Sequence, residues 1–259
     1  MTGAAVAKHK LKPEALLIDG DILLYRFASS NEFKVQWEEG QEVTKVVKPE
    51  EAQFDLAMFV QKMLEKTACL SEAIIFSGAN NFRYTVLPSY KHNRVGLEKP
   101  ALYHQLKAWV VEHFITKEKD TLEGDDVMGI MATAYPGRYK IATIDKDLKQ
   151  IPGQHFDWNH DKQFTVTVEE ADRWFYRQVL TGDPTDGYTG CPKMGPVKAD
   201  RLLDATPVEK RWDAIVCAYF KAGLTEQDAL QQARVARILR ASDYDFEKKE
   251  IKLWTPASS

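Results

Sequence analysis

The sequence predicts an α/β protein with a central, mostly parallel sheet and a smaller helical part toward the C-terminus. Two short apolar runs, ALLID at residues 15–19 and AIIF at 73–76, are typical of buried strands. Pro49 opens an amphipathic helix between them, and a strand, a helix and a strand in succession indicate parallel pairing. After residue 175 the pattern becomes helical around a loop rich in glycine and proline.

The other elements follow in order along the chain. Apolar residues at helical spacing predict two helices after the second strand; their stripes are Leu102, Leu106, Trp109 and Val110, then Val127, Ile130, Met131 and Ala134. The segment YKIATIDKD predicts a third strand that ends at Asp145, and FTVTV alternates as a strand does. The helical part begins in the helix predicted at Glu169–Leu180, and Thr225 starts its last helix.

Composition and charge limit the classes of protein that fit. The 259 residues are 44% hydrophobic, enough for a sizeable core. We expect a flexible N-terminus at residues 1–14, an α/β core at 15–175 and a helical part at 176–259. The net charge is −3, but residues 83–119 hold seven Lys or Arg against three acids and are locally basic.

Several kinds of site and location are disfavoured. The three cysteines are far apart and lack CxxC spacing, so neither a disulfide framework nor a zinc site is indicated, and a reducing cytosol fits. The histidines also lack ligand spacing. The N-terminus is too short and polar for a secretory signal, and no apolar run is long enough to span a membrane, so we expect no membrane partner.

Acidic residues gather at places that the predicted topology brings together. Asp19 and Asp145 end strands, and in an open parallel sheet the ligand site lies outside the carboxyl ends of the strands. The other acidic candidates are Asp147, the helix-opening Glu123, Asp125 and Asp126, and Asp183 and Asp186 in the later loop. So many carboxylates would repel one another unless cations neutralise them. Two magnesium ions ~4 Å apart would do so and could cleave a phosphodiester.

Each acidic residue taken alone is also explained by a structural role. Acids in a first helical turn cap free N–H groups and complement the helix dipole. Asp21 is the weakest candidate of the group, because it could cap the helix that starts near Ile22. The capping explanation does not account for all the positions together.

In these motifs the chain resembles the 5′→3′ exonucleases and flap endonucleases of tailed bacteriophages, relatives of the nuclease domain of bacterial DNA polymerase I. The motifs, in the order of that family, are LLIDGD, FRYTVLPSYKHNR, LEGDDVMG, TIDKDL, LTGDPTDGYTG and GPVKADRLL. The resemblance implies a PIN-like nuclease core, a helical arch around residues 83–119 and a helix-three-turn-helix motif that grips duplex DNA.

The resemblance also implies roles for individual residues. Asp19, Glu123, Asp125, Asp126, Asp145, Asp147, Asp183 and Asp186 would hold two divalent cations, Mg²⁺ or Mn²⁺. Lys91 and Arg94 would touch the scissile phosphate, Tyr90 would stack on the terminal base, and Arg83 would contact the same strand. Lys193 and Lys198 would bind the duplex beside a glycine-containing turn, where the family often holds a monovalent cation such as K⁺. Basic residues interleaved with aromatic ones suit such a surface, although a solvated basic loop has the same composition.

The family resemblance further implies a 5′→3′ exonuclease with flap endonuclease and RNA primer-removing activity in phage DNA replication. Its partners would be duplex ends, 5′ flaps, RNA/DNA hybrids and phage replication proteins. The protein would be a monomer and would act in the cytoplasm of the infected host. A PIN-type ribonuclease and a catalytically weakened branched-DNA-binding protein are the alternatives.

Two departures from the family pattern affect the expected cation sites. The turn CPKMG replaces a glycine-rich turn, and FSGANN at residues 76–81 lacks the Asp that relatives carry after the second strand. We expect one metal position to be weaker for that reason, and an Asp at Gly78 to strengthen it.

Overall fold

A computed structural model describes residues 13–35 and 44–256 of the chain. Its main sheet has six strands in the order β5 (Thr116–Lys119), β4 (Ser71–Ser77), β1 (Ala15–Asp19), β6 (Tyr139–Ala142), β7 (Gly153–Asp157) and β8 (Lys162–Val166). Neighbours from β5 to β7 are parallel, and β8 returns antiparallel to β7. The predicted α/β fold with a mostly parallel sheet is confirmed.

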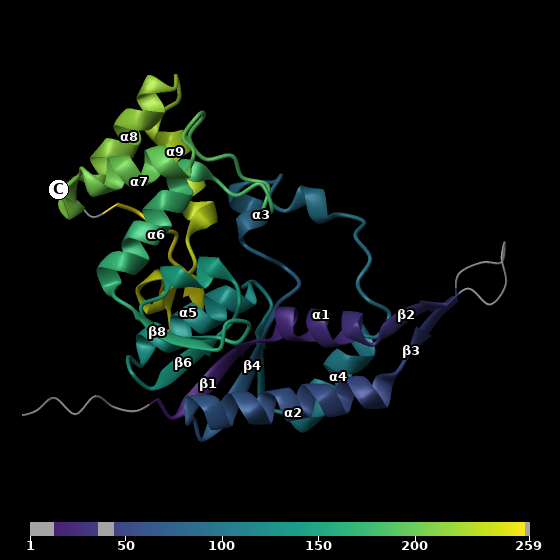
Figure 1. The fold of residues 1–259 in the computed structure, drawn as a ribbon. Helices are drawn as coiled ribbons and strands as arrows, with labels where there is room; N and C mark the ends of the chain where they lie inside the picture. The colour runs from purple at the N-terminus through teal and green to yellow at the C-terminus, as the bar shows by residue number, and fades with distance from the viewer. Residues whose placement is uncertain (1–12, 36–43, 257–259) are drawn as a thin grey trace, which may run out of the picture.

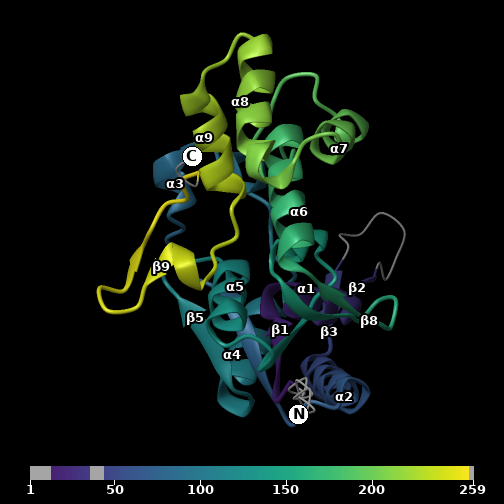
Figure 2. The ribbon, with the colours of Figure 1, turned by 90° about the vertical axis from the view of Figure 1, so that its left-hand side faces the viewer.

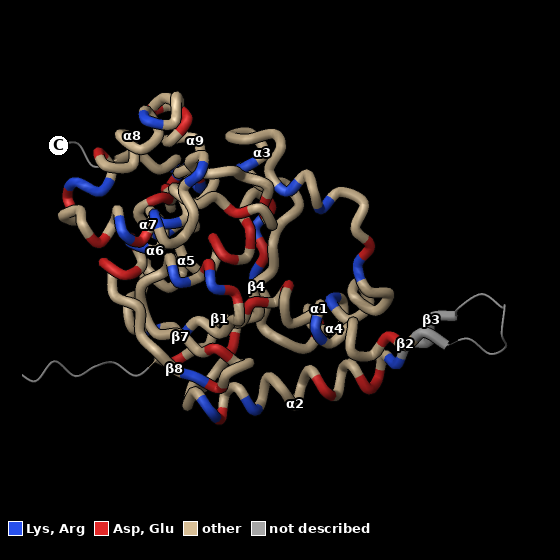
Figure 3. The backbone as a smooth tube through the Cα atoms, turned by 45° about the horizontal axis from the view of Figure 1, so that its top comes forward, with Lys and Arg blue, Asp and Glu red and all other residues tan. Residues whose placement is uncertain are grey.

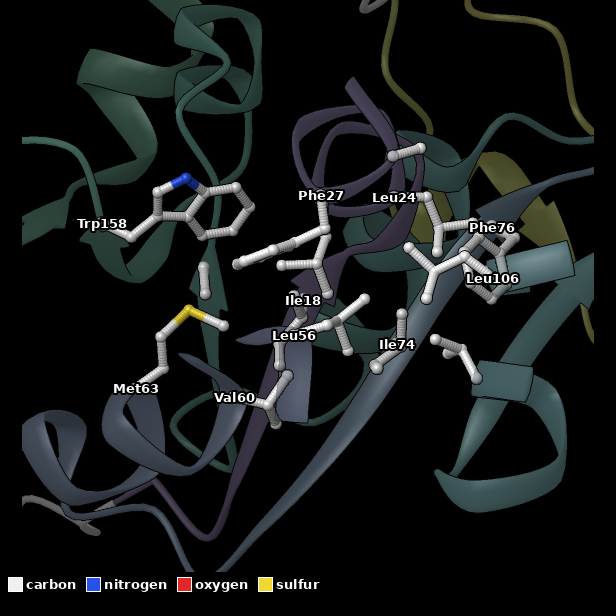
Figure 4. Close-up of a cluster of buried hydrophobic side chains, with 14 of the residues drawn as sticks. Ile18, Leu24, Phe27, Leu56, Val60, Met63, Ile74, Phe76, Leu106 and Trp158 are labelled. Atoms are coloured by element: carbon white, nitrogen blue, oxygen red, sulfur yellow. The ribbon is translucent and has the colours of Figure 1, made fainter. Parts of the chain in front are cut away.

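Helices cover both faces of this sheet, because successive side chains of a strand point to opposite faces. The covering helices are α1 (Gly20–Ser30), α2 (Pro49–Thr67) and α4 (Tyr103–His113) on one face and α5 (Gly124–Ala134) on the other. In β1, Ile18 packs with Leu24 and Leu56 of the first layer (Figure 4), whereas Leu17 packs with Met128 of α5. The core therefore has three layers, with the sheet in the middle (Figure 1).

A second apolar core lies among the C-terminal helices. These are α6 (Val168–Thr181), α7 (Pro196–Asp204), α8 (Arg211–Lys221), which follows the short 3₁₀ helix η3 (Val208–Lys210), and α9 (Glu226–Ala236). Figure 2 shows α6 running from the sheet to the other three helices. The boundary predicted near residue 175 thus falls inside a continuous helix.

The chain returns to the first core after α9. Ile238 packs with Met128 in the layer beneath the sheet, and Leu239 contacts Leu122 and Ile130. The short elements of this tail are η4 (Ala241–Asp243), β9 (Tyr244–Asp245) and β10 (Glu250–Ile251), which lie beside α5 and β5 in Figure 2. The segment 176–259 is therefore not wholly separate from the α/β core.

The region expected to form a helical arch is less helical than predicted. It begins with α3 (Arg83–Val86) and contains the 3₁₀ helix η1 (His92–Arg94), while α4 belongs to the core layer and β5 to the sheet. We call residues 87–102 the strap; it runs from α3 to α4 at the side of the molecule (Figure 1). β2 (Glu32–Val35) and β3 (Thr44–Val47) form an antiparallel hairpin beyond α1.

The third predicted strand ends earlier than expected. β6 stops at Ala142, and the 3₁₀ helix η2 (Lys146–Gln150) begins after Asp145. The backbone N–H of Asp145 donates to the hydroxyl of Thr143 at 2.9 Å, which turns the chain out of the sheet. Within the described ranges, no helix has the length and apolar character needed to cross a membrane.

Candidate active site

A cleft of about 240 Å³ lies at the carboxyl ends of β1 and β4, where Figure 3 shows acidic residues gathering near the middle of the molecule. Seven of the eight predicted metal ligands line it: Asp19, Glu123, Asp125, Asp145, Asp147, Asp183 and Asp186. The predicted phosphate-binding residues Lys91 and Arg94 line it as well. The structure thus brings together carboxylates from four separate segments of the chain.

Asp19 is held by the start of α1 and by the segment after β6. One of its oxygens accepts a hydrogen bond from the Ile22 N–H at 3.3 Å, so Asp19 and not Asp21 is the cap of this helix. The other oxygen accepts from the Thr143 hydroxyl at 2.9 Å. The start of α1 and the residue that follows β6 therefore fix this carboxylate at the carboxyl end of β1.

Asp145 and Asp147 belong to the turn that leads into η2. The Asp147 N–H donates to Asp145 Oδ1 at 2.8 Å, which orients the first carboxylate. Oδ1 of Asp147 is buried and has no hydrogen-bond partner among the described residues. A buried carboxylate oxygen without a partner is costly unless a cation or water completes it.

The loop after α6 brings Asp183 and Asp186 to the cleft. Asp183 forms an antiparallel bridge with Tyr188, and its side chain accepts from the Thr185 N–H at 2.7 Å. The loop closes at a neck, where a Cβ on Gly182 would lie 2.4 Å from the carbonyl carbon of Thr189 and one on Gly190 would lie 2.2 Å from the Gly182 nitrogen. Both glycines have a φ of +65°, so only glycine fits this crossing without strain.

Side chains from the strap neutralise one side of the cleft. Lys91 forms an ion pair with Glu123 and lies 3.7 Å from Asp186, and Arg94 bonds Asp186 at 2.6 Å. The Tyr90 hydroxyl is 3.0 Å from both carboxylates. Burial alone would raise the pKa of Glu123, but the charges of Arg83 and Lys91 outweigh it and hold that pKa below its usual value.

The carboxylates on the other side have no such partner. Among the described residues, no cation forms a salt bridge with Asp19, Asp125 or Asp147. Burial raises the pKa of Asp19 to about 7, and burial together with the charge of Asp145 raises the pKa of Asp147 to about 7. Burial, with the charge of Asp19, also raises the pKa of Asp125 well above its ordinary value. This side of the cleft favours either protons or an added cation.

The residues of the cleft fit divalent cations in chemistry but do not form a closed cage. All the acidic side chains offer oxygen, the ligand that Mg²⁺ and Mn²⁺ prefer, and Asp147, which has the unpartnered oxygen, lines the cleft with them. In the described part of the chain, however, no three His, Cys, Asp or Glu side chains are gathered closely enough to hold an ion as they stand. Since Mg²⁺ usually keeps several of its waters, the residues suit ions that are held partly through water.

Three predicted roles need correction. Asp126 does not line the cleft: it is fully buried, and its two oxygens pair with Arg83 at 2.7 and 2.8 Å. Arg83 is only 2% exposed and also donates to the Val235 and Arg237 carbonyls, so in this structure it cannot contact a DNA strand. Tyr90 is 2% exposed within the second apolar core, where no base can stack on it.

The weakest acidic candidate and one residue that sequence reasoning missed complete the site. Asp21 lines the cleft, and so does Ser77, which the sequence did not indicate; the Ser77 hydroxyl accepts from the Gly124 N–H at 2.9 Å. The sequence signal for Asp21 was its spacing from Asp19. The Asp expected to help at Gly78 does not fit, because a Cβ there would lie 2.1 Å from the Lys119 carbonyl oxygen. Ser77 is the position at the end of β4 that faces the cleft.

The structure has two further hollows, one that opens from the cleft and one that is separate from it. A cavity of about 990 Å³ opens from the cleft beneath the strap, and exposed Tyr84 lies in its wall with Arg26, Lys99 and Lys107. A separate hollow of about 530 Å³ lies between α7 and α8 and contains Lys193, Lys198 and Lys221. The Lys198 ammonium donates to the Lys193 carbonyl at 3.1 Å, beside the turn at residues 191–195.

Comparison with known proteins agrees with this architecture. Residues 14–176 match the model of the 5'-3' exonuclease N-terminal resolvase-like domain. The chain is 32% identical to the exonuclease of Escherichia phage T7, over 93% of both chains, and 33% identical to the exodeoxyribonuclease of Enterobacteria phage T3, over 94% of this chain and 93% of that one.

Solved structures share the fold at low sequence identity. One is the T5 5'-exonuclease with divalent metal ions (zinc) bound; it has a TM-score of 0.60 and 15% identity, over 86% of this chain and 93% of that one. Another is a bacteriophage T5 flap endonuclease in a pseudo-enzyme-product complex with DNA and metal ions, with a TM-score of 0.59 and 14% identity, over 86% of this chain and 88% of that one.

Proposed function

The chain belongs to the 5'-3' exonuclease family and is a 5′ nuclease, and on this premise we propose that it hydrolyses DNA at duplex ends and 5′ flaps with two divalent cations, Mg²⁺ or Mn²⁺. We further propose that it removes RNA from RNA/DNA hybrids during phage DNA replication, as a monomer in the cytoplasm of the infected host. These finer assignments are inferences from the site and from the relatives.

The observation that carries the proposal is the division of the cleft into two sides. Carboxylates without cationic partners face Lys91 and Arg94 across a volume of about 240 Å³. A protein that only bound DNA would have no use for this negative charge, since it repels phosphate. A hydrolase that uses cations to cleave a phosphodiester needs the carboxylates to hold the cations and the basic side chains to bind the phosphate.

The cations would be held by the carboxylates of the cleft. Asp19, Asp125, Asp145 and Asp147 would hold one, and Glu123, Asp183 and Asp186 would contribute to the second. When bound, the cations would neutralise the phosphate and lower the pKa of a water for attack. The fixed hydrogen bonds of Asp19 to Thr143 and Ile22 keep its oxygens oriented before any ion arrives.

Lys91 and Arg94 would exchange partners when DNA binds. In the DNA-free protein they neutralise Glu123 and Asp186. A scissile phosphate in the cleft would offer them anionic oxygens, and Glu123 and Asp186 would then be free to hold a divalent cation. Their donors would act where negative charge develops on the phosphate, which lowers the barrier more than it strengthens binding.

The duplex would lie on the hollow between α7 and α8. Lys193 and Lys198 form no salt bridge in the described chain, and Lys193 and Gly195 are exposed in the turn that leads to the N-terminus of α7. The cavity beneath the strap would receive the strand that carries the 5′ end. Its mixture of basic and aromatic walls suits backbone charge and unstacked bases.

The variant Asp145→Asn tests the proposal. We expect single-turnover cleavage of 5′-labelled duplex, flap and RNA/DNA hybrid to fall on the order of a thousandfold, because several kcal/mol of barrier are lost with a cation ligand. Duplex binding measured by fluorescence anisotropy should survive. Loss of binding with an unchanged cleavage rate would refute the role, and preference for single-stranded RNA would favour a PIN-type ribonuclease.

A further inference from the structure

We propose that Asp21, fixed by the Ser77 N–H and the Tyr103 hydroxyl, supplies the negative charge that the end of β4 lacks and strengthens cation binding in the cleft. The proposal deepens the proposed function and depends on the same cleft. It assigns a role to the Asp21 carboxylate, which does not cap α1, and to the Tyr103 hydroxyl, which the core packing of its ring does not explain.

The neighbouring strand ends differ in charge. β1 ends on Asp19, and Asp145 follows β6, but β4 ends on the neutral Ser77. The carboxylate of Asp21 reaches from the first turn of α1 to this position and accepts from the Ser77 N–H at 2.9 Å. The negative charge at the end of β4 therefore comes from a neighbouring element.

Asp21 is available to a ligand because its carboxylate neither caps its helix nor pairs with a cation of the described chain. Asp19 already caps α1, so Asp21 has no capping bond to make. In the described part of the chain, no Lys, Arg or His forms a salt bridge with Asp21, whereas Glu123 and Asp186 are paired with Lys91 and Arg94. Asp21 lines both the cleft and the cavity beneath the strap, so it faces the junction of the two.

The hydrogen bonds of Asp21 indicate how it would serve a cation. One oxygen accepts from Ser77 and the other from the Tyr103 hydroxyl at 2.8 Å. An ionised carboxylate offers about four acceptor positions, so one remains on each oxygen. We infer that Asp21 accepts hydrogen bonds from waters that a divalent cation retains and adds its charge to the site without direct coordination.

Tyr103 is the positioning residue for this carboxylate. It is the first residue of α4 and directly follows the strap, and its ring packs in the core under the ammonium of Lys99 at 4.0 Å. Its hydroxyl has one structural partner, Asp21. Tyr103→Phe would leave the ring in place and release one oxygen of the carboxylate.

The test measures cation affinity directly, without DNA and without turnover. Mn²⁺ binding is followed by electron paramagnetic resonance and calorimetry in the full-length protein. We expect Asp21→Asn to weaken binding on the order of 10- to 100-fold, as is usual when an outer-shell partner is lost, and Tyr103→Phe to weaken it less. Asp120→Asn is the matched control: Asp120 is exposed, bonds Asn80 and lies outside the cleft, so affinity should be unchanged.

A double variant tests whether the charge at the end of β4 is what matters. In the Asp21→Asn background, Ser77→Asp should recover much of the Mn²⁺ affinity, provided that circular dichroism shows the wild-type fold. Asp21→Asn with wild-type affinity would overturn the proposal, and so would a folded double variant that recovers none. If the wild-type protein binds Mn²⁺ but cleaves no DNA, the proposed function fails while the assignment of Asp21 stands.

Discussion

Asp125 and Asp126 are neighbours in the sequence but lie in opposite environments, so replacing each by Asn separates a role in the cleft from a role in the fold. Asp125 lines the cleft without a cationic partner. Asp126 is fully buried, pairs with Arg83 through both oxygens and accepts from the Leu239 N–H at 3.0 Å. The second side chain therefore joins α5 to α3 and to the C-terminal tail.

The expected loss of stability in Asp126→Asn follows from this burial. Removing one partner of a buried ion pair leaves the other charge uncompensated and costs about 3–5 kcal/mol. With an unfolding entropy of about 2.1 cal/mol/K per residue, the 259 residues give roughly 0.54 kcal/mol/K, so Tm should fall by about 6–9 °C. Cleavage measured well below Tm should stay within about tenfold of wild type, because Asp126 does not face the cleft.

Asp125→Asn should have the opposite effects: stability is kept and cleavage is lost. Its pKa is raised by burial and by Asp19, so the folded protein holds the proton more tightly than the unfolded chain does. Stability therefore falls as pH rises above the pKa of the unfolded chain, and at neutral pH the ionised group opposes folding. Without divalent ions this variant should melt at or above the wild-type temperature, while cleavage falls on the order of a thousandfold.

Thermal unfolding by circular dichroism in EDTA and single-turnover cleavage of a 5′-labelled flap measure both effects on the same preparations. The reasoning would be refuted if Asp126→Asn melted at the wild-type temperature and lost cleavage, because Asp126 would then act in the cleft after all. A large destabilisation of ion-free Asp125→Asn would contradict the electrostatic argument for its neighbour.

Other predictions follow from the charges of the cleft and of the α7–α8 hollow. Lys91→Ala removes one of the two cations that pair with Glu123, so the variant should bind Mn²⁺ several-fold more tightly by calorimetry and yet cleave more slowly in a single turnover. Weaker Mn²⁺ binding would contradict the exchange of partners. The pKa of both Asp19 and Asp147 is raised to about 7, so their contribution to the stability of the ion-free protein should fall as pH rises from about 4 to about 7. The rise in Tm on adding Mg²⁺ should therefore be larger at pH 8 than at pH 6. An equal rise at both pH values would refute this. Lys198→Ala should weaken duplex binding and lower its salt slope by about one phosphate contact, and an unchanged slope would remove it from the interface.

The position of Asp19 at a strand end was predictable, since it ends an apolar run typical of a buried strand. The rule that ligands bind at the carboxyl edge of a parallel sheet also placed Asp145 at this edge, although β6 stops at Ala142, before Asp145. The helices were also predictable, since Pro49 and Thr225 mark their starts and apolar spacing marks their faces. β5 was missed because its sequence, TKEK, is that of a charged edge strand without an apolar run.

The direction of a side chain around a helix start could not be predicted. Successive helical residues point about 100° apart, so the sequence EGDD does not show which Asp faces the cleft until the docking of α5 is known. The same holds for Asp19 and Asp21, of which only the structure shows which caps α1. Arg83 was assigned to DNA from the family resemblance, but it is buried against Asp126 and Val235, which are remote in sequence.

The neck formed by Gly182 and Gly190 connects the acidic loop of the cleft to the turn before α7. The loop that carries Asp183 and Asp186 begins at Gly182, and the turn that precedes α7 begins after Gly190, so the crossing joins the two. The Gly190 N–H also donates to the side chain of Gln232 in α9 at 2.8 Å. We therefore expect the distance between the proposed duplex-binding surface and the cleft to be set by this tight crossing and not by a flexible hinge. We expect the protein to measure a constant number of nucleotides from the duplex junction, whatever the sequence of the DNA.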